Sequence, residues 1–235
     1  MLNKAEGTIN SIWGDKTLAQ DLLSLLAKEK VIAIIRGIPK GSGEQTAKAL
    51  AAGGISFLEI TLNTDGALDM IDEVKGEFGE RIKVGAGTVL NLKMAKEAIQ
   101  AGAEYIISPN LDEEVLTYGL EQGVEVWPGT MTPSEIVRAY NLGAKAVKVF
   151  PIGSLGVKYI KDLRAPLSHI PMVATGGVNL DNIKEVLGYG AVAVGLGGNL
   201  VNNRLIEKGD FEKITHMAAS YTKLAKEVEE NAAKS

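Results

Sequence analysis

Residues 134–150 have the sequence SEIVRAYNLGAKAVKVF, and this stretch contains the pattern that decides the fold. Up to Leu142 its apolar residues recur at helical spacing with charged residues between them, which predicts an amphipathic helix. Gly143 follows, and glycine offers the left-handed backbone that commonly ends a helix. The mostly apolar run Ala146–Phe150 is typical of a buried parallel strand. The stretch therefore predicts a helix that turns back into a sheet.

The same unit recurs along the chain at intervals of about 20 to 25 residues. Apolar runs that predict strands occupy Val31–Ile35, Ile55–Leu62, Ile82–Val84, Tyr105–Ile107, Val124–Trp127, Ala146–Phe150, Met172–Ala174 and Ala191–Val194. Amphipathic segments that predict helices occupy Gly43–Ala52, Ala67–Phe78, Leu92–Ala101, Glu113–Gln122, Ser134–Leu142, Val157–Leu163 and Leu180–Leu187. Eight such units predict an α/β fold, the closed (β/α)8 TIM barrel, with a doubly wound open sheet as the alternative.

The two ends of the chain extend this pattern. Lys16–Lys30 predicts an extra N-terminal helix, and Phe211–Val228 predicts the last helix of the barrel. We expect a frayed end over Glu229–Ser235. Because barrels of this kind reach about 250 residues as one unit, we expect residues 1–235 to form a single domain.

Composition excludes several classes of protein. The net charge is −4 and no long run of Lys or Arg occurs, so we expect no nucleic-acid partner. No apolar run reaches the roughly 18 residues of a membrane helix, and the first thirty residues lack the pattern of a signal peptide. The chain has no Cys, which excludes disulfides and thiolate metal sites and favours a cytoplasmic location.

A TIM barrel builds its active site at the C-terminal ends of its strands. The predicted strand ends carry Arg36, Glu59 with Thr61, Thr88, Ser108–Pro109, Thr130, Lys148, Thr175–Gly177 and Gly195–Gly198. Three of these residues are ionisable and stand within or beside strongly apolar strands, namely Arg36, Glu59 and Lys148.

Lys148 lies between Val147 and Val149, so strand alternation places it on the opposite face from both valines. If that face is the interior of the barrel, burial lowers the pKa of the ammonium, and a neutral amine is a nucleophile for carbonyl groups. Two other interpretations remain open, a structural ion pair with Glu59 or an outward lysine that covers a helix.

Glu59 is a lone carboxylate in the apolar run Phe57–Thr61. Burial would raise its pKa toward the range that suits general acid–base catalysis. Its other interpretation is the structural partner of Lys148. Arg36 ends the first predicted strand, where a guanidinium can hold a substrate carboxylate through two hydrogen bonds, or can simply face the solvent.

Two glycine clusters, Thr175–Gly177 and Gly195–Gly198, follow the last two predicted strands. Backbone amides in these loops are the common phosphate site of TIM barrels, although tight turns alone also explain glycine. The two histidines, His169 and His216, fall away from the predicted strand ends. One carboxylate with hydroxyls and amides makes a poor set of metal ligands, so we expect no metal and no cofactor.

Read in order, several motifs resemble the KDPG/KHG aldolase family over about Val31 to Val201. The motifs are Val31-Ile-Ala-Ile-Ile-Arg-Gly37, Leu58-Glu-Ile-Thr-Leu-Asn-Thr64, Val84-Gly-Ala-Gly-Thr-Val-Leu90, Ile107-Ser-Pro-Asn110, Pro128-Gly-Thr130, Val147-Lys-Val-Phe-Pro151 and Thr175-Gly-Gly177. The combination of Gly-Ala-Gly-Thr-Val-Leu, Lys-Val-Phe-Pro and Thr-Gly-Gly in this order is more specific than any one motif.

The resemblance implies a metal-independent class I aldolase without a cofactor. Lys148 would form the Schiff base and Glu59 would transfer protons. The keto acid and its carboxylate would contact Arg36, Thr88, Pro109 and Phe150. The phosphate would bind to Thr175, Gly176, Gly177, Gly197 and Gly198. The implied substrate is a 2-keto-3-deoxy-6-phospho sugar acid, cleaved to pyruvate and D-glyceraldehyde 3-phosphate, with 4-hydroxy-2-oxoglutarate as a further substrate. Similarity to the family also implies a homotrimer.

The chain departs from the family pattern at two positions. Asn63 stands where many gluconate-type members have Arg, so carboxylate binding would depend on Arg36. Gly198 stands where the phosphate loop usually has Ser, which removes a hydroxyl donor. Asn63 and the Ile-Arg-Gly ending resemble the 6-phosphogalactonate branch, which leaves the configuration at C4 open. Two other functions also remain open, a phosphosugar epimerase and a non-catalytic trimeric assembly subunit.

Overall fold

The computed structural model describes residues 21–232. Its strands are short and parallel, and they form one sheet in the order β5-β4-β3-β2-β1-β9-β8-β7-β6. Their bounds are Val31–Ile35 (β1), Phe57–Thr61 (β2), Lys83–Gly87 (β3), Tyr105–Ile107 (β4), Glu125–Trp127 (β5), Gly129–Thr130 (β6), Val147–Val149 (β7), Met172–Thr175 (β8) and Ala193–Leu196 (β9).

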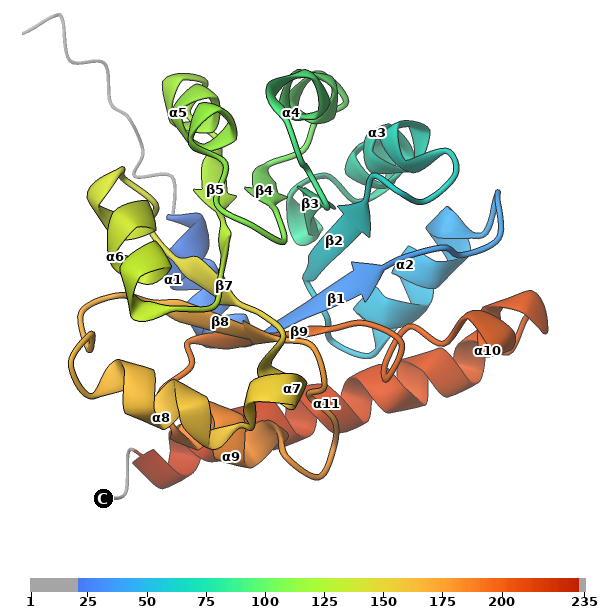
Figure 1. The fold of residues 1–235 in the computed structure, drawn as a ribbon. Helices are drawn as coiled ribbons and strands as arrows, with labels where there is room; N and C mark the ends of the chain where they lie inside the picture. The colour runs from blue at the N-terminus through green and yellow to red at the C-terminus, as the bar shows by residue number, and fades with distance from the viewer. Residues whose placement is uncertain (1–20, 233–235) are drawn as a thin grey trace, which may run out of the picture.

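The two ends of this strand order, β5 and β6, are separated in the sequence by Pro128 alone. Proline has no N–H group and cannot donate a ladder hydrogen bond, so it interrupts a strand that otherwise continues. The carbonyl oxygen of Pro128 still accepts from the backbone N of Lys148 at 2.9 Å. The sheet is therefore a ring of eight strands, which confirms the TIM barrel and excludes the open sheet (Figure 1).

Helices surround this ring on the outside, except the first helix, which lies at one end of it (Figure 1). Their bounds are Leu22–Glu29 (α1), Gly43–Ala52 (α2), Ala67–Phe78 (α3), Leu92–Gln100 (α4), Glu113–Glu121 (α5), Pro133–Asn141 (α6), Ile152–Leu155 (α7), Lys158–Arg164 (α8), Ile183–Gly188 (α9), Asn203–Glu207 (α10) and Phe211–Ala232 (α11), with a 3-10 turn at Gly79–Arg81 (η1). Sequence reasoning missed α7 and α10, which are too short to show an apolar period.

The helix α1 lies against one end of the barrel interior. Its fully buried Leu26 belongs to the same apolar cluster as inward-facing strand residues such as Ile32, Phe57 and Trp127. The outward-facing strand residues pack instead against the surrounding helices. Of the predicted N-terminal helix, residues 22–29 are helical, and residues 16–20 lie outside the described part of the chain. Because α1 closes its end of the barrel, the opposite end is the one open to a ligand.

Some element boundaries differ from the predictions. The strand β3 continues past Val84 to Gly87, because its glycines lack the side chains that mark a strand in a sequence. The strand β9 lies two residues later than the predicted Ala191–Val194. The helix α11 continues to Ala232, so the expectation of a frayed end from Glu229 is wrong up to that residue.

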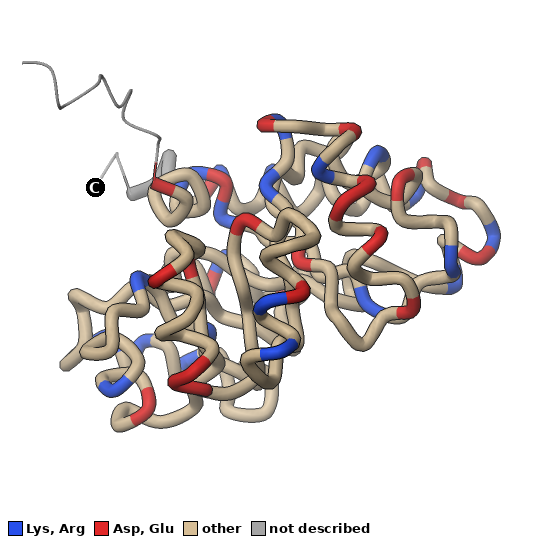
Figure 2. Tube along the Cα trace, turned by 90° about the horizontal axis from the view of Figure 1, so that it is seen from above, with Lys and Arg blue, Asp and Glu red and all other residues tan. Residues whose placement is uncertain are grey.

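Charged residues of both signs alternate over the outer segments of the described chain, and we find no stripe of one sign there (Figure 2). Within residues 21–232, no helix combines the length and the apolarity that a bilayer-crossing segment needs.

Candidate active site

Lys148 lies in the middle of β7, and its side chain points into the barrel. The side chain is only 5% exposed. Its backbone is held on both sides, since its N donates to Pro128 and its O accepts from the buried hydroxyl of Thr130 at 3.1 Å. The Nζ atom lies 5.2 Å from the centre of the Phe150 ring, in reach of a cation–π contact. The inward interpretation of Lys148 is therefore confirmed.

Glu59 points into the same interior from β2, and its side chain is 1% exposed. Its Oε1 atom lies 3.9 Å from Nζ of Lys148, which is too long for a direct hydrogen bond. This oxygen has no hydrogen-bond partner within the described chain. Buried polar atoms in a purely structural pair are normally satisfied, so an unsatisfied carboxylate oxygen facing a buried amine indicates a functional site.

Gly87, at the end of β3, makes room for this carboxylate. A Cβ atom at position 87 would lie 2.1 Å from Oε1 of Glu59 and 2.6 Å from its Cγ. Only glycine therefore allows Glu59 its observed position.

Tyr105 supports Glu59 from β4. Its hydroxyl donates to the backbone O of Leu58 at 2.7 Å. Burial raises the pKa of Tyr105 well above its usual value, and the charge of Glu59 adds to this effect. The phenol therefore stays protonated, and its hydroxyl donates to Leu58 O and holds β2 in place next to Glu59.

Arg36 follows β1, and hydrogen bonds hold the backbone around it from two directions. From the β2 side, the hydroxyl of Thr61 donates to Ile35 O at 3.3 Å, and the hydroxyl of Thr64 accepts from Gly37 N at 2.9 Å. From α10, the side-chain amide of Asn203 donates to Arg36 O at 3.2 Å and to Gly37 O at 2.8 Å. The direction of the Arg36 side chain is therefore set by residues that lie far apart in the sequence.

The guanidinium of Arg36 reaches Thr88, whose hydroxyl accepts from Nη2 at 3.4 Å. Thr88 follows β3 with a backbone φ of 58°, a left-handed conformation that is unusual for a β-branched residue. Strain of this kind is typical of functional sites, where a side chain must point in one direction.

One cavity of about 390 Å³ joins most of the predicted site residues. It is lined by eight of the eleven, namely Arg36, Lys148, Phe150, Thr175, Gly176, Gly177, Gly197 and Gly198, together with Ile34, Val178, Gly195 and Asn199. Glu59 and Thr88 do not line this cavity, but each lies next to a residue that does. Glu59 is 3.9 Å from Lys148, and Thr88 is 3.4 Å from Arg36. Sequence reasoning missed Ile34, because an apolar strand residue has no chemistry that distinguishes it from the core.

The glycine loops present free donors to this cavity. The backbone N–H groups of Gly176, Gly177 and Gly198 donate no hydrogen bond within the described chain. Gly177 has a φ of 85°, and a Cβ there would lie 2.6 Å from Cα of Gly153. The loop after β8 therefore needs glycine, and it leaves amides free to bind an anion.

Pro109 is the predicted site residue that the structure does not bring to this cavity. It follows β4 and is exposed, and its carbonyl lies against Gly129, where a Cβ would come within 2.3 Å of it. Pro109 therefore packs against β6, the strand that pairs with the strand of Lys148, and does not face the cavity.

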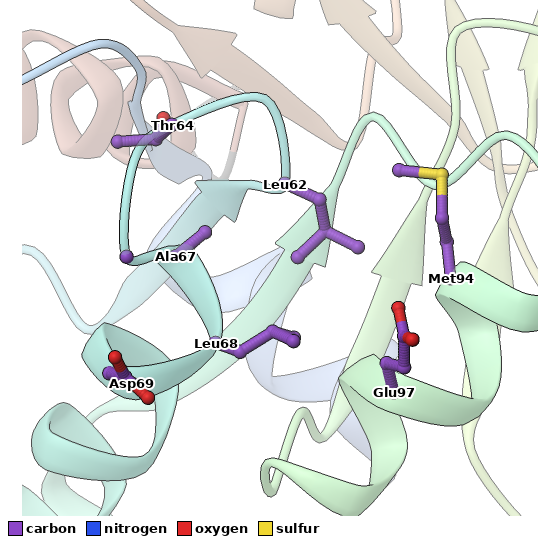
Figure 3. A pocket seen from close by; sticks show the side chains of 8 residues that line it. Leu62, Thr64, Ala67, Leu68, Asp69, Met94 and Glu97 are labelled. Carbon is purple, nitrogen blue, oxygen red and sulfur yellow. The ribbon is translucent and has the colours of Figure 1, made fainter.

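A separate cavity of about 350 Å³ lies between α3 and α4, outside the ring of strands. Figure 3 shows that Leu62, Leu68, Met94 and Glu97 point toward this space from different elements. It contains none of the predicted site residues. Among residues 21–232, no group of three or more His, Asp and Glu side chains is placed to hold a metal ion.

Comparison with known proteins agrees with this geometry. The model of the family described as KDPG and KHG aldolase matches residues 22–217. The chain is 38% identical over 181 residues to the KHG/KDPG aldolase of Escherichia coli K12, covering 77% of this chain and 84% of that protein. It is 32% identical over 201 residues to the 2-dehydro-3-deoxy-6-phosphogalactonate aldolase of the same organism, covering 85% and 96% of the two chains.

A solved structure of KDPG aldolase from Legionella pneumophila contains pyruvate captured as a covalent carbinolamine intermediate. It superposes with a TM-score of 0.80 and 28% identity, covering 86% of this chain and 98% of that one. Together with the buried lysine and carboxylate at the open end of the barrel, these matches show that the chain belongs to the KDPG/KHG aldolase family and is a carbon–carbon lyase of the class I, Schiff-base type.

Proposed function

We propose that the chain cleaves a 2-keto-3-deoxy-6-phospho sugar acid to pyruvate and D-glyceraldehyde 3-phosphate through a Schiff base on Lys148. One observation carries this proposal. The Nζ atom of Lys148 lies on the wall of the 390 Å³ cavity, buried, and 3.9 Å from an unsatisfied oxygen of Glu59. A buried amine next to a buried carboxylate supplies both a nucleophile and a base.

The reaction begins when Nζ of Lys148 adds to the C2 keto carbon, and loss of water gives an iminium. Glu59 takes the proton of the C4 hydroxyl, either directly or through a water molecule. The C3–C4 bond breaks, its electrons move into the iminium to give an enamine, and the aldehyde leaves. Glu59 returns the proton to C3, and hydrolysis of the imine releases pyruvate and the free lysine.

The remaining site residues bind the two anionic ends of the substrate. We assign the carboxylate to Arg36 and Thr88, which already contact each other. Phe150 packs beside Lys148 and covers the imine, whereas Pro109 lies outside the lining of the cavity and is assigned no contact. The phosphate is assigned to Thr175 and to the backbone of Gly176, Gly177, Gly197 and Gly198.

Relatives of the chain act on both C4 epimers, as the names of the gluconate and galactonate enzymes state. The kcat/KM ratio for the two epimers assigns the configuration. Cleavage of 4-hydroxy-2-oxoglutarate is measured in the same assay, because one relative is named a KHG/KDPG aldolase.

Borohydride reduction in the presence of pyruvate tests the proposal. We expect loss of activity and one reduced pyruvyl group on the peptide that carries Lys148. Lys148→Arg keeps the charge but lacks a nucleophilic amine, so it should abolish the labelling and the activity while the fold survives. Lys158→Arg, at an exposed lysine outside the cavity, is the control and should label normally. Labelling of another lysine would disprove the assignment.

We also propose a homotrimer and a cytoplasmic location. Four large apolar side chains on or beside α5 and α6 are exposed, namely Leu120, Val137, Tyr140 and Leu142, and association would bury them. Light scattering should then give three times the 24.9 kDa mass of the chain.

The cytoplasmic location is supported by the absence of Cys, and cell fractionation tests it.

A further inference from the structure

A third cavity, of about 530 Å³, adjoins the catalytic cavity. It lies between the loop after β1 and the segment that leads into α10, and it shares Ile34, Arg36 and Gly198 with the catalytic cavity. Its lining adds Arg204 and includes no Asp or Glu. The family motifs did not point to Arg204.

The arginines of the chain differ in what their guanidinium groups bind. Arg81 and Arg164 donate to backbone carbonyls, and Arg138 pairs with Glu113. The side chain of Arg36 makes a single long contact of 3.4 Å to Thr88. Within the described chain, the guanidinium of Arg204 makes no hydrogen bond or ion pair. Arg36 and Arg204 therefore have the guanidinium groups with the weakest protein contacts of the five arginines, and both line the same cavity.

The backbones that carry these two arginines are tied together. Asn203, the neighbour of Arg204, donates to the carbonyls of Arg36 and Gly37. The side chain of Asn202 accepts from Arg204 N at 3.0 Å and caps α10. Figure 1 shows α10 beside the loop that follows β1. The two positive charges are thus held on one wall without a protein carboxylate, so each can bind an anionic group of the substrate, the carboxylate at Arg36 and a second anion at Arg204.

We propose that this cavity is a second anion-binding compartment, in which Arg204 binds the phosphate monoester end of the substrate against the amide of Gly198. The proposal rests on the aldolase function proposed above and deepens it. Gly198 lines both cavities, so a phosphate on its amide lies at their junction and within the lining that Arg204 completes. Arg204 then supplies the contact that a hydroxyl at position 198 would otherwise give.

Steady-state kinetics of Arg204→Gln tests the proposal with two substrates, the phosphorylated keto acid and its unphosphorylated counterpart. For the phosphorylated substrate we expect KM to rise roughly 10- to 100-fold with kcat nearly unchanged, which is the usual worth of a charge-assisted contact. For the unphosphorylated substrate both constants should change less than about twofold. Arg204→Lys keeps the charge and should recover part of the affinity.

Lys208→Gln is the matched control, because it removes the same charge four residues later at a position outside the cavity lining. It should leave both KM values close to wild type. An equal rise of KM for Arg204→Gln and Lys208→Gln would show a general effect of net charge and would overturn the proposal. So would an equal rise for both substrates, or no rise at all.

Inhibition by inorganic phosphate distinguishes the two anions that could occupy the cavity, the phosphate end of the substrate and free phosphate. If the compartment holds the phosphate end of the substrate, phosphate should inhibit competitively, and its inhibition constant should rise in Arg204→Gln. Non-competitive inhibition that depends on Arg204, with an unchanged KM, would assign the cavity to free phosphate and reject the proposal. Exchange of pyruvate methyl protons needs no phosphate group, so its loss in the wild type would count against the aldolase mechanism instead.

Discussion

Oε1 of Glu59 lies 3.9 Å from Nζ of Lys148, and no other described group satisfies this oxygen. The gap is wider than a hydrogen bond, yet both groups are buried on facing strands of one narrow barrel. A substrate hydroxyl or a water molecule between the two groups could hydrogen-bond to both, and proton transfer in the proposed mechanism requires such a bridge.

Glu59→Gln should separate imine formation from proton transfer. The amide keeps the size of the side chain but cannot accept the proton. Pyruvate should still condense with Lys148, while exchange of its methyl protons with deuterated water should fall by roughly 10² to 10⁴. NMR measures the exchange, and a thermal melt measures stability. A variant that exchanges at the wild-type rate but loses about 3 to 5 kcal/mol of stability would show a structural ion pair.

Gly87→Ala should displace Glu59 without changing any ionisable group. The new Cβ would lie 2.1 Å from Oε1, so the carboxylate must move. We expect methyl exchange to fall at least about tenfold, because a small misplacement of a catalytic group is costly, while borohydride labelling of Lys148 continues.

Gly76→Ala is the control for this substitution. Gly76 lies in α3, and a Cβ there meets no other atom within 4 Å. This variant should exchange normally and gain about 0.5 to 1 kcal/mol of stability, since alanine suits a helix better. Normal exchange in both variants would contradict the role of the space beside Gly87.

Thr64→Val should weaken carboxylate binding through Arg36. Valine has the shape of threonine but cannot accept the hydrogen bond from Gly37 N. We expect KM for the keto acid to rise about tenfold with a smaller change in kcat, and Thr64→Ser should restore binding. In an Arg36→Ala background, Thr64→Val should have no further effect on KM. Additive effects in that background would show that Thr64 acts elsewhere.

Asp21→Asn should loosen the attachment of α1 in a pH-dependent way. A hydrogen bond from Lys145 holds the pKa of Asp21 below its usual 3.8, and Lys145 also contacts Glu125 at 3.1 Å. A depressed carboxylate pKa stabilises the fold above pH 3.8, and this stability is lost as pH falls through the lower folded value.

The variant should therefore be less stable than wild type at pH 7, by about 0.2 to 1 kcal/mol because the pair is largely exposed. Urea unfolding at pH 7 and near pH 2 checks this. The two proteins should have the same midpoint at the acidic pH, and a difference that persists there would refute the ionic origin.

The sequence by itself predicted the barrel and placed Lys148 on the strand face opposite Val147 and Val149, while the tertiary structure decided that this face is the interior. Strand alternation and the repeated helix–glycine–strand unit are local patterns, and they fix which residues face the interior once the strands pair. The apolar run Phe57–Thr61 marked Glu59 as a lone carboxylate in a strand, and the glycine clusters marked the loops of the catalytic cavity.

Only the tertiary structure decided how these residues meet. The bond between Asn203 and Arg36 joins residues 167 positions apart, which become neighbours only because the barrel closes β9 against β1. In the same way, closure leaves Pro109 outside the catalytic cavity and brings Arg204 to the wall that Arg36 occupies. Distances such as the 3.9 Å between Lys148 and Glu59 depend on the packing of all eight strands, and no local pattern specifies them.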